Sequence, residues 1–242
     1  MPCKQAITIP VRPQIQGQYR SPEGTWNMGH WACIMGPLAA KLLAGGSRDI
    51  YNNVYCSSTL LGAAMHGDLT SDDTVLMLSI DGAQLFESKQ SDFWLYIWVL
   101  LDLAPDLWYK KKYVLPGGFI LGPKKPKNLN SFMYTGLHHL SALQRDGLHV
   151  WDCQTGHIFT LCPFFFLGTA DGPGPAALHG QVGHHGAFEC QEYCGLRGRH
   201  KPGLTITQLS WNLWTTCFLS VIITTLTHTI FLRHQLGCTL II

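Results

Sequence analysis

The sequence predicts an α/β fold in which three consecutive strands, a helix and a fourth strand form one sheet. Short apolar runs rich in aromatic and β-branched residues recur between residues 75 and 170, which is typical of buried strands. Residues 130–147 instead repeat their apolar side chains at helical spacing. A chain of 242 residues is long enough for one sizeable domain. We therefore expect one α/β core with appendages.

The first 48 residues specify little regular structure. Pro, Gly and Gln punctuate the first 25 residues, and the weak helix candidate at 31–43 is interrupted by Gly36 and Pro37. The following pattern, over residues 49–67, favours one or two short helices that end at glycine.

Four strands and one longer helix are expected after this segment. Pro116, Gly117 and Gly118 should break or bulge the third strand. Asn130 or Ser131 can cap the start of the helix, and Gly147 can close it. The expected strands are 75–81, 93–103, 111–121 and 158–170.

The order of these elements, β-β-β-α-β, predicts how the sheet is assembled. Three strands in succession suggest an antiparallel meander, and the helix suggests a crossover that returns the fourth strand beside the first. This crossover would bring Asp81 and Asp171 together although 90 residues separate them. The arrangement is that of a ribonuclease H-like core.

The two aspartates are the candidate catalytic residues. Asp81 in SIDG and Asp171 in TADG each follow an apolar, strand-like run. Paired carboxylates can hold two divalent cations, Mg²⁺ or Mn²⁺, against phosphate oxygens. The alternative is turn chemistry, because Asp-Gly is favoured wherever the backbone reverses. A third nearby acid, Asp102, is expected to be structural.

A Cys/His cluster follows Asp171 and predicts a zinc site. It contains His184 or His185, then Cys190, Cys194 and His200, and the C-x3-C spacing lies within the range for a zinc knuckle. The alternative is a loop with free thiols. Nine cysteines without a framework fit a reducing compartment better than a disulfide scaffold, and the amino terminus has no signal-peptide pattern.

Three basic clusters are candidates for contacts with DNA phosphates, although the net charge is only +2. The alternative for each cluster is a solvent-exposed loop with no binding role. The residues are Lys110, Lys111, Lys112, Lys124, Lys125, Lys127, Arg197, Arg199 and Lys201.

The carboxyl-terminal tail is the anomaly of the sequence. Residues 204–232 contain no Lys, Arg, Asp or Glu, and no acid follows Glu192. The tail is long enough to span a bilayer as a helix. A buried apolar segment, or an out-of-place sequence without a designed fold, are the alternatives.

Residues 49–203 resemble the transposases of CACTA-type (En/Spm-like) DNA transposons, in the form common in mushroom-forming (basidiomycete) fungi. The resemblance rests on a chain of linked motifs rather than on one short pattern. The motifs are DDTVLMLSIDGAQLF, YIWVLLDLAPDLWYKKKYVLPGGFILGPKKPKN, SFMYTGLHHLSALQRDGLHVWD and TADGPGPAALHGQVGHHGAFECQEYCGLRGRHKPG.

The resemblance implies a function and a set of roles. A ribonuclease H-like domain of this family cuts and joins DNA at transposon ends with two divalent ions held by three acids. Asp81 is similar to the first acid and Asp171 to the second, while Cys190, Cys194 and His200 resemble the ligands of a Cys/His insertion. The third acid belongs further downstream, where this tail has none. A truncated, inactive copy is therefore expected.

The resemblance also sets the expected organisation and location. We expect a poorly specified segment (1–48), a partial transposase core (49–182), a zinc-like insertion (183–203) and an apolar tail (204–242). The expected partners are DNA and an intact transposase copy, and the expected location is the nucleus. The alternative functions are a small membrane-anchored protein, held by residues 204–232, and a catalytically dead DNA-binding remnant.

Overall fold

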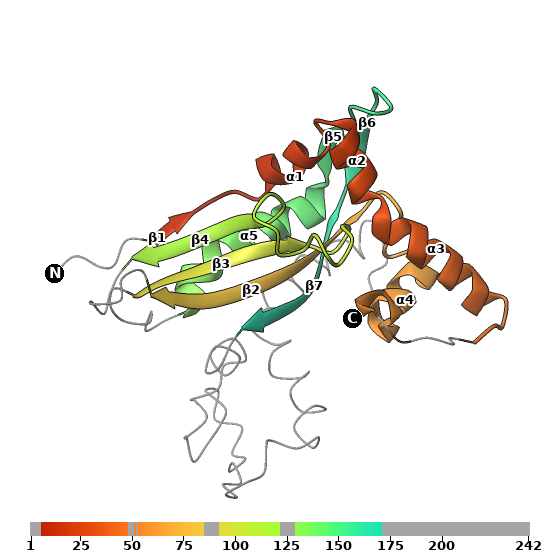
Figure 1. Ribbon diagram of the computed structural model, residues 1–242, viewed down its shortest axis with the longest axis horizontal. Coiled ribbons are helices and arrows are strands. Elements are labelled where there is room, and N and C mark those ends of the chain that lie inside the picture. Colours follow the sequence, from red (N-terminus) through yellow and green to blue (C-terminus); the bar gives the residue numbers. More distant parts are fainter. Residues whose placement is uncertain (1–5, 48–50, 52, 85–91, 122–128, 171–242) are drawn as a thin grey trace, which may run out of the picture.

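A computed structural model of the chain describes residues 6–47, 51, 53–84, 92–121 and 129–170 (Figure 1). Its strands are β1 (Ala6–Thr8), β2 (Thr74–Gln84), β3 (Asp92–Leu100), β4 (Leu115–Leu121), β5 (Leu148–Trp151), β6 (Ile158–Leu161) and β7 (Pro163–Ala170). Its helices are α1 (Arg12–Gln18), α2 (Pro22–Met28), α3 (His30–Leu43), the 3-10 helix η1 (Val54–Cys56), α4 (Ser58–His66) and α5 (Leu129–Asp146).

The main sheet has the strand order β1-β4-β3-β2-β7, and β5 pairs with β6 in a separate hairpin. The strands β2, β3 and β4 form an antiparallel meander. After α5 and the hairpin, β7 returns to pair with β2 in parallel. The predicted α/β class and the return of the last strand beside the first of the meander are therefore confirmed.

Apolar layers cover both faces of this sheet. On one face, Leu76, Leu78 and Ile80 of β2 belong to a cluster that includes Phe132 and Leu140 of α5. On the other face, Val75 and Met77 join a second cluster with residues of α3, η1 and α4. This alternation explains the continuously apolar sequence of β2, because a strand covered on both faces presents apolar side chains to each of them.

The sequence predicts α4 and α5 well, because glycine ends both helices. Gly67 follows α4 with φ 81° and Gly147 follows α5 with φ 74°, in the left-handed region that favours glycine. The Ser57 hydroxyl also accepts a hydrogen bond from the Leu60 amide, 3.3 Å away, at the start of α4.

The predicted strand 158–170 is instead two strands in two different sheets. The chain leaves the β5–β6 hairpin at Cys162 and enters the main sheet at Pro163. At this point the Cys162 amide donates to the Asp73 carboxylate, 3.0 Å away, and the Thr74 amide donates to the Cys162 carbonyl. The sequence is apolar through residues 158–170, so it gives no sign that the chain changes its partner strand at Cys162.

Two other predicted strands are too long. The strand β3 ends at Leu100, and the strand β4 begins only at Leu115. The Lys110 carbonyl accepts hydrogen bonds from the amides of Tyr113 and Val114, so residues that read as strand form turns. Gly117 does bulge β4 as predicted, because Tyr96 lies opposite Gly118 and Ile97 opposite Pro116.

Residues 6–47 are more regular than their sequence indicates. The strand β1 pairs antiparallel with β4 at the sheet edge. Helix α1 buries Ile15 in the main core, whereas α3 runs through Pro37 and buries Trp31 and Met35 in the second cluster. Burial against the sheet stabilises these helices despite their weak local signals.

Within the described part of the chain, no helix is long and apolar enough to cross a membrane. The segment 204–232, for which the sequence leaves a membrane helix open, lies outside the described residues.

Candidate functional site

Asp81 lies inside strand β2, three residues before its end. Asp81 pairs with Leu95 and Gly82 pairs with Trp94 across the antiparallel ladder with β3. The alternative interpretation of Asp81-Gly82 as a chain reversal is therefore wrong, because both residues are in extended, paired backbone. The predicted end of this strand at residue 81 is also wrong.

The cover over one face of β2 ends before Asp81. Val75 and Met77 are buried against α3, η1 and α4, Ser79 is half-buried, and Asp81 is exposed. These four residues share one face of the sheet because side chains alternate along a strand. Figure 1 shows α3 and α4 beside the start of β2, away from its arrowhead. Among the described residues, the apolar cover of this face therefore ends before the exposed side chain of Asp81.

A bulge between β2 and β7 sets which residues come to this place. Leu76 lies opposite Phe165 and Met77 opposite Leu167, so Phe166 is an extra residue in β7. After the bulge, Ser79 lies opposite Thr169 and Ile80 opposite Ala170. Thr169 therefore shares the face of Ser79, and Asp171 follows it two residues later in the sequence.

Several predicted site residues lie outside the described residues. These are Asp171, the zinc candidates His185, Cys190, Cys194 and His200, and the basic residues Lys124, Lys125, Lys127, Arg197, Arg199 and Lys201. Their roles stay predictions of the sequence. Over the described ranges, no three His, Cys, Asp or Glu side chains gather as a metal site.

Asp102 is structural, as predicted, and cannot complete the site at Asp81. Its carboxylate is buried and accepts hydrogen bonds from the Thr74 hydroxyl at 2.6 Å and the Val75 amide at 3.1 Å. Burial raises the pKa of Asp102 to about 7. Asp81 lies six residues beyond Val75 along β2, which is about 20 Å at 3.3 Å per residue.

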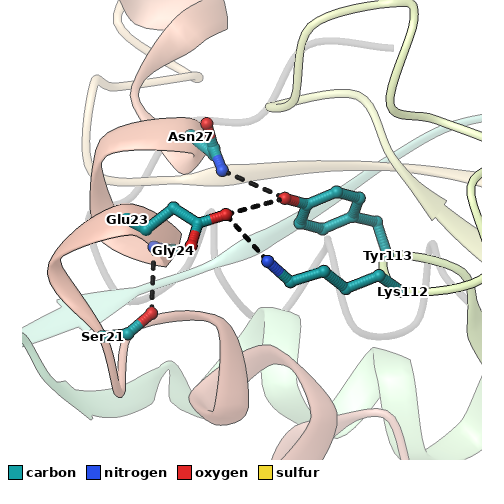
Figure 2. Close-up of polar contacts among 6 residues, drawn as sticks. All are labelled: Ser21, Glu23, Gly24, Asn27, Lys112 and Tyr113. Atoms are coloured by element: carbon teal, nitrogen blue, oxygen red, sulfur yellow. Dashed lines mark hydrogen bonds and ion pairs between the residues drawn. The ribbon is translucent and has the colours of Figure 1, made fainter.

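Two of the three lysines near β4 pair with acids, which weakens their assignment as phosphate ligands. Lys110 lies 3.1 Å from Asp106, and Lys112 lies 2.7 Å from Glu23 of α2. Figure 2 shows that Glu23 also accepts from the Tyr113 hydroxyl, which in turn accepts from Asn27. This network fastens α2 to the loop before β4. The ion pair lowers the pKa of Glu23 and raises that of Lys112.

Lys111 is the member of this cluster with the strongest case for binding DNA. It is exposed, and it makes no ion pair with any described acid. We expect Lys111→Ala to reduce the slope of log affinity against log salt for duplex DNA by about 0.9, the value for one lost phosphate contact. Lys110→Ala should change the slope less, and a larger change for Lys110→Ala would contradict this ranking.

Two hydroxyl residues at the site were missed in the sequence. Ser79 precedes Asp81 by two residues, and Thr169 precedes Asp171 by the same spacing. The sequence did contain a signal for them, because a hydroxyl residue occurs two positions before each aspartate and residues two apart in a strand share a face.

These features define an α/β protein with an exposed acid on a central strand whose parallel neighbour leads to a second acid. The model of the transposase family tnp2 matches residues 66–202, which is more than half of the chain. The chain belongs to this family. The matched region runs from the end of α4 through β7 and includes both Asp81 and Asp171. No curated protein matches the chain. Family membership makes DNA the general class of partner.

Proposed function

We propose that this chain is a CACTA-type transposase core of the ribonuclease H-like type, of the form found in mushroom-forming fungi, which acts on DNA at transposon ends. In this proposal Asp81 and Asp171 are two of the three acids that hold divalent metal ions for phosphodiester cleavage and strand transfer in intact members of the family. The observation that carries the proposal is the parallel register between β2 and β7, in which Ile80 lies opposite Ala170.

The described register ends at Ile80 and Ala170, and in the sequence each of these residues directly precedes one of the two aspartates. Directly opposed residues of a ladder share a face, and neighbouring strands lie about 4.8 Å apart. Two carboxylates at that separation can share a pair of divalent ions, which lie about 3.5–4 Å apart in two-metal sites. The register thus supports joint action by the two aspartates.

The described donors suit Mg²⁺ or Mn²⁺, because carboxylate and hydroxyl oxygens are hard ligands that these ions prefer. When bound, such ions polarise phosphate oxygens and lower the pKa of water. Asp81 would hold them at a rigid point, since its backbone pairs with Leu95 of β3 and the preceding residue, Ile80, pairs with Ala170 of β7. Asp81 is exposed, as a residue that acts on a DNA strand must be.

A chain of these 242 residues would supply two acids where the family mechanism uses three. Asp102 cannot be the third acid because it lies at the opposite end of β2, and no Asp or Glu follows Glu192. We therefore propose that this chain alone performs no useful strand transfer. In this proposal the chain binds DNA in the nucleus or acts beside an intact transposase copy.

Metal binding at Asp81 is the direct test. We expect Asp81→Asn to weaken Mn²⁺ binding to the full chain by at least about tenfold, because loss of a ligand should exceed the effect of losing an outer partner. Calorimetric titration or Mn²⁺ paramagnetic resonance measures this affinity. Asp106→Asn is the matched control, because Asp106 is an exposed acid that pairs with Lys110. Equal affinities in the two variants would reject the assignment of Asp81.

Magnesium- or manganese-dependent nicking of terminal-repeat DNA tests the second half of the proposal. We expect no nicking above background. Nicking by the chain that disappears in Asp81→Asn would reject the proposed inactivity and support the proposed site.

A further inference from the structure

We propose that Asp102 and the turn around it form a proton-controlled latch, which holds the helices α3, η1 and α4 on the sheet and releases them when the carboxyl loses its proton. These three helices are called the helical layer below. The latch concerns the conformation of the chain and does not depend on the proposed function.

Hydrogen bonds from the helical layer converge on the turn that follows β3, residues 101–103. The Trp31 amide at the start of α3 donates to the Asp102 carbonyl, 3.1 Å away. The Tyr55 hydroxyl of η1 lies within hydrogen-bond distance of the Leu101 and Leu103 carbonyls. Trp31, Tyr55 and Leu101 are all buried in the same apolar cluster. The turn is therefore a polar anchor for the layer.

The Asp102 side chain fastens this anchor to the start of β2. One carboxylate oxygen accepts from the Thr74 hydroxyl at 2.6 Å and from the Val75 amide at 3.1 Å. The other oxygen is buried and has no hydrogen-bond partner in the described part of the chain. A buried charge with an unpartnered oxygen is unfavourable, whereas a neutral carboxyl is tolerated much better.

No cation compensates the Asp102 carboxylate among the described residues, where none of the ion pairs includes it. Tyr19 after α1 and Tyr55 of η1 are the nearby hydroxyls, and burial and then the Asp102 carboxylate raise the pKa of both, so both stay neutral. His30 of α3 lies beside the Tyr55 ring, 6.2 Å between centroids. Asp73, just before β2, is a further acid.

The helical layer is the side from which water can reach the carboxylate. The strand β2 lies between β3 and β7, so its displacement would break two ladders. The layer instead forms no strand pair with the sheet, and it rests on side-chain packing and on the anchor at residues 101–103. Local openings of such a layer require less free energy than global unfolding.

The direction of the pH effect follows from the two forms of the carboxyl. Burial raises the pKa of Asp102 to about 7 while the layer is closed. In the open form water restores the ordinary pKa near 4. The closed form thus binds more protons between pH 4 and 7, and the opening equilibrium should rise by up to about 100-fold from pH 5 to pH 8.

Hydrogen exchange of the full chain at pH 5 and pH 8, corrected for the intrinsic pH dependence of exchange, measures this opening. We expect the amides of α3 and α4 to lose protection by about 30–100-fold between the two pH values. The amides of β2 and β3 should stay more protected than those of the layer at both pH values. Equal protection of layer and sheet would overturn the latch, because the layer would then open only by global unfolding.

Three variants separate the proton from the anchor. Asp102→Asn should abolish the pH dependence of protection in the layer, and Asp106→Asn, at an exposed acid paired with Lys110, should retain it. Tyr55→Phe removes an anchoring hydroxyl, so it should lower the protection of the layer at both pH values by a similar factor. A pH dependence that persists in Asp102→Asn, or full protection of the layer in Tyr55→Phe, would overturn the latch. The parent and Tyr55→Phe profiles keep the test decisive where Asp102→Asn does not fold.

Discussion

Asp102→Asn is expected to remove a fall in stability that the parent protein shows as the pH rises from about 4 to 7. The folded protein holds the pKa of Asp102 at about 7, well above its ordinary value near 4, because the carboxyl is buried. The folded state therefore binds more protons than the unfolded state in this pH range. The free energy of unfolding decreases through the range by up to about 4 kcal/mol and levels off above pH 7.

The packing around Asp102 explains why the charge is unfavourable. One carboxylate oxygen accepts from Thr74 and Val75, but the other has no hydrogen-bond partner in the described part of the chain. The hydrogen bonds around Asp102 join uncharged groups. The Trp31 amide donates to the Asp102 carbonyl, and the Tyr55 hydroxyl donates to the Leu101 and Leu103 carbonyls.

Urea unfolding at pH 5 and pH 8 measures this effect. The difference between the parent and Asp102→Asn should change by several kcal/mol between the two pH values, as a carboxyl pKa near 7 requires. Asp106→Asn, at an exposed acid, should keep the pH dependence of the parent. Parallel pH profiles for the parent and Asp102→Asn would show that Asp102 does not titrate in this range.

Gly136→Ala is expected to destabilise the parent protein more than it destabilises a Tyr96→Phe background. Tyr96 is buried, and its ring lies against the positions where Gly117 and Gly118 of β4 and Gly136 of α5 would carry a side chain. A Cβ atom at Gly136 would overlap the Tyr96 hydroxyl oxygen. Overpacking of this kind costs about 1–3 kcal/mol.

The Tyr96→Phe background separates the clash from the helix effect. Removal of the hydroxyl removes the closest contact at Gly136 but leaves the ring carbon Cζ of residue 96 at 3.0 Å, whereas alanine favours a helix over glycine by up to about 1 kcal/mol. In this background Gly136→Ala should thus destabilise less than in the parent. A double-mutant cycle from urea unfolding gives the coupling energy. Equal destabilisation in both backgrounds would place the clash elsewhere, and Gly62→Ala in α4, where nothing lies within 4 Å, is the control.

Much of the sheet was predictable because its signals are local. The runs that form β2 and most of β3 are apolar on both faces, which is the pattern of buried strands. Glycine after α4 and α5 marks both helix ends. The strand boundaries near Leu100 and Leu115 were not predictable, since turn hydrogen bonds at Lys110 decide them. Helices α1 and α2 were missed, and α3 was only a weak candidate at 31–43, because their stability comes from packing on the sheet rather than from propensity.

The sequence by itself determined the family motifs, the two aspartates and the order of the main elements. Only the tertiary structure decided how these parts combine. Asp81 lies inside a paired strand, and the Asp102 carboxylate contacts the opposite end of β2 at Val75. Lys110 and Lys112 each form an ion pair with an acid. The tertiary structure also inserted Phe166 as a bulge, which sets Thr169 rather than Gly168 opposite Ser79. The physical reason is that register and pairing depend on contacts between residues about 90 positions apart, which no local pattern contains.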